Sequence, residues 1–300
     1  MKILVTGSSG LVGSRLVPAL RAEGHDVVRL VRHRSQLASD AALWSPAERQ
    51  IDPAALENCD AVVNLAGETI AAGRWSEKRK RAIRSSRVDA TRTIAESLAG
   101  LPRKPQVLLN ASAIGYYGSR GAEVLDESSS SGSGDFLSSV CRDWESATQP
   151  AAAAGVRVVL TRFGVILSGQ GGALKKMLLP FQLGLGGRVG SGDQYMSWIA
   201  IDDVVGGILH CLRGPSISGP VNFVSPQCVS NLEFTKTLGR VLRRPTVFPM
   251  PEFVVRVAFG QMGQELLLAS QRVQPTALAA SGYAFGFPSL ESALQHVLAR

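Results

Sequence analysis

The chain opens with Lys2-Ile3-Leu4-Val5-Thr6-Gly7-Ser8-Ser9-Gly10-Leu11-Val12-Gly13, an apolar run that leads into a glycine-rich turn. The run predicts a buried β-strand, and the amphipathic pattern over residues 11–23 predicts a helix directly after the turn. Gly7 permits the tight turn, Gly10 lets the main chain approach a pyrophosphate, and Gly13 lets helix and strand pack closely. The anion would lie at the helix N-terminus, where N–H groups and the helix dipole converge. The segment therefore predicts a dinucleotide-binding domain.

Short runs rich in Val, Ile and Leu alternate with helical patterns through the first two hundred residues. The predicted strands are residues 2–6, 26–31, 60–65, 106–111 and 156–162. The predicted helices between them are residues 11–23, 77–99 and 136–154. Such alternation is typical of a parallel sheet covered by helices on both faces. It predicts an α/β fold, a Rossmann-type doubly wound parallel sheet with a smaller C-terminal region on the substrate side.

The remainder of the chain is less regular. Residues 112–135 are rich in Ser, Gly and acidic residues and predict a loop. The last fifty residues have helical patterns and predict a small separate unit. We therefore expect an NAD(P)-binding Rossmann-type domain over residues 1–225 and a small C-terminal helical domain over residues 249–297.

The composition narrows the class of protein. Hydrophobic residues make up 45% of the 300 residues, which is enough for a large core. No apolar run approaches the about 18 residues that a membrane-spanning helix needs. The four cysteines have no CxxC spacing and the chain opens without an export signal, so we expect reduced thiols and a cytoplasmic protein. The four histidines are too scattered to predict a metal site, and the oligomeric state is not indicated.

The end of the second predicted strand indicates which dinucleotide binds. An NAD site usually has Asp or Glu there to hold the ribose 2′-hydroxyl. This chain has Arg29, Arg32, His33 and Arg34 instead, with no acid. A guanidinium binds a 2′-phosphate bidentately, and Arg32 directly follows the strand, so we predict NADP(H) with Arg32 on the 2′-phosphate. The alternative is that Arg32 is merely an exposed arginine at a strand end.

A second turn of small residues, Asn64-Leu65-Ala66-Gly67, follows the strand at 60–65 and would let the main chain approach the cofactor. The alternative is a purely structural strand-to-loop turn. Arg87 is a further candidate, although charge on a helix surface explains it equally well. The predicted cofactor-binding residues are Thr6, Gly7, Gly10, Leu11, Val12, Gly13, Arg32, Leu65, Ala66, Gly67 and Arg87.

Several motifs together resemble one atypical family of extended short-chain dehydrogenases/reductases, known as NAD-dependent epimerase/dehydratase or nucleoside-diphosphate-sugar epimerase proteins. The motifs are Lys2 to Gly13, Asn64 to Glu68, Arg74-Trp75, Ser86-Arg87, Ser112 to Gly118, Asp143-Trp144-Glu145, Arg162 to Leu167, Ser197 to Ile199, Ile201 to Asp203, Asn222 and Gln271 to Pro275. The tail resembles the small C-terminal domain of unknown function that accompanies this family. The resemblance implies a Rossmann fold, NADP(H) binding and a substrate cleft between the sheet and the C-terminal part.

The resemblance does not extend to the usual catalytic pair. The wider superfamily uses a Tyr-x-x-x-Lys pair on a helix, in which the lysine lowers the tyrosine pKa. Here Phe136 pairs with Val140 and Leu137 with Cys141, so the helix offers no such base. The remaining catalytic candidates are Ser112, Tyr116 and Tyr117, which follow the strand at 106–111 on the carboxyl edge of the sheet. For the tyrosines, packing is an equally good explanation, and Ser112 can be a plain turn residue.

Three functions fit these observations. The first is an NADP(H)-dependent oxidoreductase or epimerase that acts on a small, phosphorylated or nucleotide-linked molecule. The second is a sensor that binds NADP(H) without turnover, which the missing Tyr/Lys pair favours. The third is nucleic-acid binding through the basic stretch from Arg74 to Arg87, which the net charge of +8 favours. We rank it last and expect no nucleic-acid partner, because no recognition motif is present and a solvated helix face explains the charge.

Overall fold

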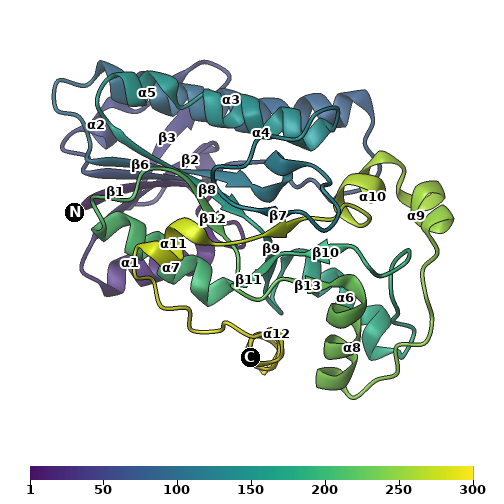
Figure 1. The fold of residues 1–300 in the computed structure, drawn as a ribbon. Helices are drawn as coiled ribbons and strands as arrows, with labels where there is room; N and C mark the ends of the chain where they lie inside the picture. Colours follow the sequence, from purple (N-terminus) through teal and green to yellow (C-terminus); the bar gives the residue numbers. More distant parts are fainter. Residues whose placement is uncertain (300) are drawn as a thin grey trace.

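The computed structural model describes residues 1–299, and its centre is an eight-stranded sheet (Figure 1). The strand order is β12-β8-β6-β5-β1-β2-β3-β4, and all neighbours are parallel except β3 and β4. The strands are β1 (Lys2–Thr6), β2 (Asp26–Val31), β3 (Ala41–Ser45), β4 (Gln50–Ile51), β5 (Ala61–Asn64), β6 (Val107–Ala113), β8 (Arg157–Phe163) and β12 (Gly219–Phe223). Because the chain winds outward from β1 in both directions, the predicted doubly wound α/β fold is confirmed.

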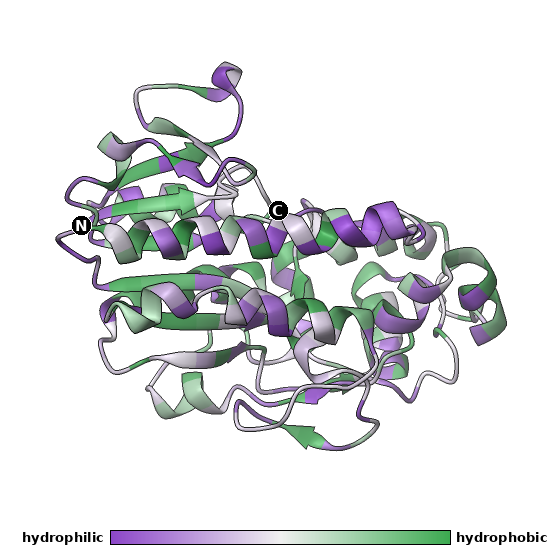
Figure 2. Cartoon of the chain, turned by 90° about the horizontal axis from the view of Figure 1, so that it is seen from above, coloured by the Kyte–Doolittle hydropathy of each residue, from purple (hydrophilic) through white to green (hydrophobic). Residues whose placement is uncertain are grey.

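Helices cover both faces of the sheet. In Figure 1, α3 (Glu77–Gly100), α4 (Phe136–Ser146) and α5 (Gln149–Ala153) lie above the sheet. Below it lie α1 (Gly13–Ala22), α7 (Ile201–Arg213) and α11 (Thr276–Ala280). Figure 2 shows that the strands are mostly hydrophobic, whereas the helices carry both hydrophilic and hydrophobic residues. The single helix predicted over residues 136–154 is wrong, since α4 ends at Ser146 and α5 begins at Gln149, just before Pro150, which is favoured in a first turn.

Smaller elements lie at the carboxyl edge of the sheet. Three two-stranded pairs form there, namely β7 (Val124–Leu125) with β14 (Arg272–Val273), β9 (Val165–Leu167) with β11 (Trp198–Ala200), and β10 (Tyr195–Met196) with β13 (Val229–Ser230). The other elements are α2 (Pro53–Leu56), α6 (Gly172–Gln182), α8 (Asn231–Leu242), α9 (Glu252–Phe259), α10 (Gln261–Leu266), α12 (Leu290–Leu298) and the 3₁₀ turns η1 (Arg34–Gln36) and η2 (Ile114–Tyr117). Within residues 1–299, no helix has the length and apolar character needed to cross a membrane.

The C-terminal segment packs into the main body. Leu278 and Leu294 belong to the same buried cluster as Ile3 of the first strand. The predicted loop over residues 112–135 is held by this segment, because β7 within it pairs with β14 and Ser270 donates to the Gly121 carbonyl at 2.6 Å. The C-terminal residues are therefore in a position to shape whatever site lies at the carboxyl edge of the sheet.

Candidate functional site

In the glycine turn after β1, neighbouring main-chain segments pack closely against the glycines. Gly7 has a φ of +63°, and a Cβ there would lie 2.6 Å from the Leu65 carbonyl oxygen. A Cβ on Gly13 would lie 2.3 Å from the Gly7 oxygen, so helix and turn pack as predicted. A Cβ on Gly10 would lie 3.2 Å from its nearest heavy atom, the Gly7 oxygen. Glycine is thus required within the turn at Gly7 and Gly13, whereas Gly10 leaves the outer side of the turn clear.

Helix α1 begins with free main-chain donors. The N–H groups of Leu11, Val12 and Gly13 form no hydrogen bond within residues 1–299. The side chain of Leu11 packs against the glycines before α6, and that of Val12 is in the core. These residues therefore offer main-chain N–H groups, not side chains, and a helix N-terminus of this kind favours an anion.

Thr6, one of the predicted cofactor-binding residues, ends the first strand. Its side chain is fully buried and its hydroxyl donates to Asn64 Oδ1 at 2.7 Å. The Thr6 hydroxyl oxygen itself accepts the N–H groups of Leu65 and Ala66 at 3.0 and 3.1 Å. Thr6 thus ties the first strand to the second turn of small residues.

Arg29 within β2 and Arg32 directly after it have different environments. Arg29 makes two hydrogen bonds to Asp40, at 2.8 and 2.6 Å. Arg32 is exposed and has no hydrogen bond or ion pair within residues 1–299. Since Thr6 aligns with Leu30 across β1 and β2, Arg32 lies just past the carboxyl edge, on the same edge as Gly7. Of the two, Arg32 is the one available to a ligand.

Arg87 is partly buried beside the second turn and not on an open helix face. Its guanidinium carbon lies 3.2 Å from where a Cβ on Gly67 would be and 5.1 Å from the Trp144 ring. It donates to the carbonyl oxygens of Glu68 and Ile83 at 2.9 and 3.0 Å. It pairs with no carboxylate among residues 1–299, and burial lowers its pKa.

Arg87 lies near the part of α4 where the lysine of the superfamily's Tyr-x-x-x-Lys pair is absent. Burial raises the pKa of the Cys141 thiol on α4 to about 12, and the Arg87 charge partly opposes this shift. The guanidinium therefore faces the part of α4 that carries Cys141 and Trp144. Cys141 is where a lysine would stand if Leu137 were the tyrosine, so α3 supplies a cation to this part of the site.

Two of the three catalytic candidates are engaged in a buried polar cluster. Glu145 and Arg162 form a buried bidentate pair with both distances at 2.8 Å. Ser112 donates to Glu145 at 2.6 Å. Tyr117 is fully buried, accepts a hydrogen bond from Arg162 at 3.0 Å and donates to Asn222 at 2.7 Å, while burial raises its pKa to about 12. The hydroxyls of Ser112 and Tyr117 are therefore both engaged within this cluster.

Tyr116 remains the accessible candidate of the three. Its side chain is partly buried, and the Arg162 guanidinium lies 3.5 Å from its ring centroid. Its hydroxyl has no hydrogen-bond partner within residues 1–299. Of the three candidate hydroxyls, that of Tyr116 is therefore the one not already engaged by the described part of the protein.

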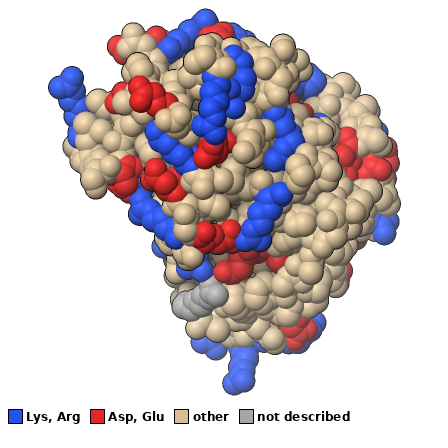
Figure 3. Space-filling view, turned by 90° about the vertical axis from the view of Figure 1, so that its left-hand side faces the viewer, with Lys and Arg blue, Asp and Glu red and all other residues tan. Residues whose placement is uncertain are grey.

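Part of the positive charge in the basic stretch from Arg74 to Arg87 is paired with carboxylates. Arg79, Lys80 and Arg84 each pair with a carboxylate, namely Glu68, Glu77 and Asp143. On the face seen in Figure 3, basic and acidic side chains are likewise interspersed. Among residues 1–299 there is also no group of three His, Cys, Asp or Glu side chains that could hold a metal ion.

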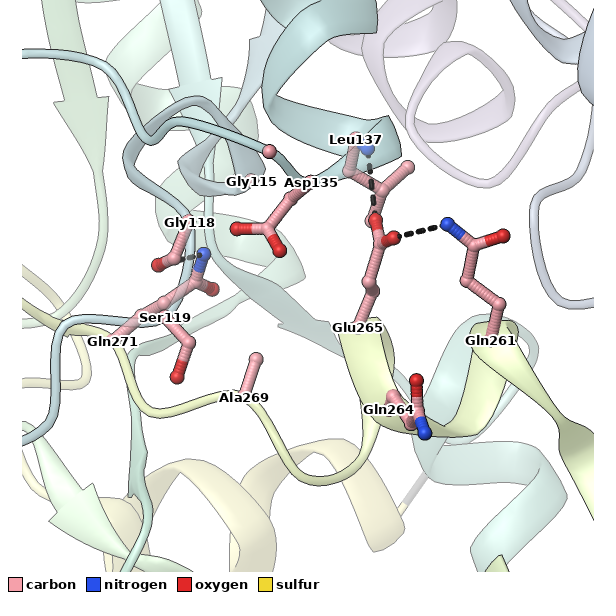
Figure 4. Close-up of a pocket in the computed structure, with 11 residues that line it drawn as sticks. Gly115, Gly118, Ser119, Asp135, Leu137, Gln261, Gln264, Glu265, Ala269 and Gln271 are labelled. Atoms are coloured by element: carbon pink, nitrogen blue, oxygen red, sulfur yellow. Dashed lines mark hydrogen bonds between the residues drawn. The ribbon is translucent and has the colours of Figure 1, made fainter. Parts of the chain in front are cut away.

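A cavity of about 450 Å³ opens beside the cluster, between η2, the start of α4 and α10 (Figure 4). Its size suits a small molecule. Eleven residues line it: Gly115, Gly118, Ser119, Gly134, Asp135, Leu137, Gln261, Gln264, Glu265, Ala269 and Gln271. Five of these come from the C-terminal segment, and the others come from the residues after β6 and from the start of α4.

A doubly wound sheet with a glycine turn after its first strand and an unpaired arginine after its second defines a dinucleotide-binding protein. The model of the NAD dependent epimerase/dehydratase family matches residues 3–222, and that of a domain of unknown function (DUF1731) matches residues 250–297. The chain belongs to this epimerase/dehydratase family, and the resemblance noted in the sequence is confirmed.

Individual relatives agree with this assignment. An epimerase family protein of Mycobacterium bovis, Mb2239, is 45% identical over 298 residues, which cover 99% of this chain and 98% of the relative. The human epimerase family protein SDR39U1, crystallised with NADPH, is 35% identical with a TM-score of 0.91 and 99% coverage of both chains. A nucleoside-diphosphate sugar epimerase of Corynebacterium glutamicum is 38% identical with a TM-score of 0.83, covering 99% of this chain and 58% of that one.

Proposed function

We propose that this protein is an NADP(H)-dependent oxidoreductase or epimerase that acts on a small, phosphorylated or nucleotide-linked molecule. The observation that carries the cofactor preference is the exposed, unpaired Arg32 at the end of β2, where an NAD enzyme has an acid. The human relative crystallised with NADPH supports the same preference.

The residues at the carboxyl edge fit this cofactor. The free N–H groups at the start of α1 would hold the pyrophosphate, Arg32 the 2′-phosphate, and Arg87 with the turn at Leu65, Ala66 and Gly67 the nicotinamide half. When bound, the cofactor would supply a hydride donor or acceptor. The uncompensated charge of Arg87 fits a group with hydroxyl or phosphate oxygens, since a buried cation without a counter-ion is costly.

For the chemistry, we propose Tyr116 as the residue that exchanges a proton with the substrate. Ser112 and Tyr117 would act as positioning residues, because their hydroxyls hold the Glu145–Arg162 pair in place. The competing function is an NADP(H) sensor without turnover. The specific observation in its favour is that α4 offers only Phe136 with Val140, or Leu137 with Cys141, at the spacing of the superfamily's catalytic pair.

Single-turnover measurements distinguish enzyme from sensor. The full-length protein is loaded with NADP+ and mixed with a panel of nucleotide sugars, and the absorbance of reduced nicotinamide is followed. We expect reduction with at least one sugar, and a loss of about 10²–10⁴-fold in rate for Tyr116→Phe with NADPH affinity unchanged. Cofactor binding without any reduction across the panel would favour the sensor.

A further inference from the structure

The charged side chains that line the cavity have the opposite sign to the net charge of the protein. The chain has a net charge of +8, yet Asp135 and Glu265 are the charged residues among those lining the cavity, and no Lys or Arg lines it. Gln271 donates its amide N–H groups to the carbonyls of Ile114 and Gly118 at 3.0 and 3.1 Å. Its own carbonyl oxygen is then left as an acceptor. The lining is therefore rich in acceptors and negatively charged.

Asp135 stands at the N-cap of α4 but does not cap it. An Asp at this position ordinarily accepts N–H groups of the first turn. Here Glu265 of α10 does so instead, accepting from Phe136 and Leu137 at 3.1 and 2.8 Å. Gln261 donates to the same carboxylate at 2.7 Å. In Figure 4 the Asp135 carboxylate accordingly points into the cavity, and it forms no hydrogen bond within residues 1–299.

A glycine keeps the space beside this carboxylate clear. Gly118 has a φ of +67°, and a Cβ on it would lie 2.6 Å from Asp135 Oδ2. Any side chain at Gly118 would displace the carboxylate from its present place. Three independent features therefore leave the same oxygen atoms open to the cavity: substitute capping by Glu265, the missing side chain of Gly118, and the lack of a cationic partner in the lining.

We propose that this cavity receives an uncharged or cationic part of the substrate that carries hydroxyl or amino groups, and that Asp135 accepts a hydrogen bond from one of them. A phosphate or carboxylate group is excluded from the cavity, because two carboxylates repel it and no lining cation compensates. This inference rests on the proposed function. It deepens that function by placing the anionic part of a nucleotide-linked substrate outside the cavity and its hydroxyl-bearing or amino-bearing unit inside.

Three probes of similar size and different charge test the inference: D-glucosamine, D-glucose and D-glucose 6-phosphate. Their dissociation constants for the full-length protein are measured by ligand-observed NMR, with and without saturating NADPH. We expect D-glucosamine to bind at least about tenfold more tightly than D-glucose 6-phosphate, and D-glucose to lie between them. In Asp135→Asn, which keeps the shape and an N-cap side chain, the ratio should fall to within about twofold.

The matched control is Asp193→Asn, which removes an exposed carboxylate away from the cavity lining and should leave the ratio unchanged. Tighter or equal binding of D-glucose 6-phosphate by the unaltered protein, an unchanged ratio in Asp135→Asn, or no binding of any probe overturns the proposal. NADPH affinity is measured in parallel on each variant. A protein that fails to bind NADPH but keeps the Asp135-dependent ratio contradicts the proposed function and not this inference.

Discussion

Replacing Arg87 with Met should weaken NADPH binding while leaving the adenosine half of the site intact. The guanidinium uses donors for the Glu68 and Ile83 carbonyls, and a guanidinium has five N–H groups, so donors remain for a ligand. A charge-assisted hydrogen bond contributes about 1.5–3 kcal/mol, which corresponds to about a tenfold to 150-fold increase in the dissociation constant. Met keeps the apolar stem that packs near Trp144.

The fragment 2′,5′-ADP separates a ligand contact from a structural effect, because it contains the adenosine and 2′-phosphate but no nicotinamide. Arg32 follows β2 on one side of β1, whereas Arg87 lies beside the turn after β5 on the other side. A dinucleotide spans this switch point. Calorimetric titration of Arg87→Met should therefore show weaker NADPH binding and unchanged 2′,5′-ADP binding.

Two further variants complete the Arg87 experiment. Arg87→Lys restores a cation and should recover part of the NADPH affinity, whereas Arg81→Met, which removes an exposed arginine from the same helix, should change neither ligand's affinity. Equal weakening of NADPH and 2′,5′-ADP in Arg87→Met would show that Arg87 acts by holding the turn. Unchanged NADPH affinity would refute a role toward the cofactor altogether.

Three other expectations can be checked directly. Gly10→Val should abolish cofactor binding in calorimetry yet still unfold cooperatively, because the side chain occupies the outer side of the turn; retained binding would make the turn purely structural. Arg162→Met should lower the free energy of unfolding in urea by about 3–5 kcal/mol, since it leaves Glu145 buried and unpaired, and adding Glu145→Gln should recover part of this loss. A loss below about 1 kcal/mol would contradict that account. At about pH 8, iodoacetamide should label Cys59, Cys141 and Cys211 of the folded protein slowly, because only the thiolate reacts and burial raises the pKa of these thiols to between about 11 and about 12. Labelling is followed by mass spectrometry, and rapid labelling of these three thiols would contradict the expectation.

The sheet could be predicted largely from the sequence because its central strands are buried on both faces. Such strands are continuous apolar runs, and β1, β2, β5, β6 and β8 lie within one or two residues of their predicted positions. The edge regions gave weaker signals. β3 alternates between buried and partly buried residues, and β12 begins with Gly219-Pro220, a pair that normally interrupts a strand.

The cofactor side of the site is local in sequence, which is why its turns could be identified. Gly7, Gly10 and Gly13 follow one strand within a single motif, and Arg32 ends the next strand. The exception is Thr6, because a hydroxyl at the end of a strand can face either a ligand or the neighbouring strand. Here the Thr6 hydroxyl donates a hydrogen bond to the neighbouring Asn64.

The substrate side depends on contacts between distant segments. Glu145 meets Arg162 only because α4 packs against β6, the neighbour of β8 in the sheet, and neither residue has a spacing that would indicate the pair. Asp135 would be read from the sequence as an ordinary N-cap. That reading fails because Glu265, far along the chain, takes over the capping and leaves the Asp135 side chain facing the cavity.

The most direct test of the central claim is a calorimetric titration of the unaltered protein with NADPH and with NADH, repeated on Arg32→Ser and on Arg34→Ser. The account predicts that NADPH binds at least about tenfold more tightly than NADH, that Arg32→Ser removes this preference, and that the neighbouring exposed Arg34 does not contribute. Equal affinities for the two cofactors in the unaltered protein, or a preference that survives Arg32→Ser, would contradict it.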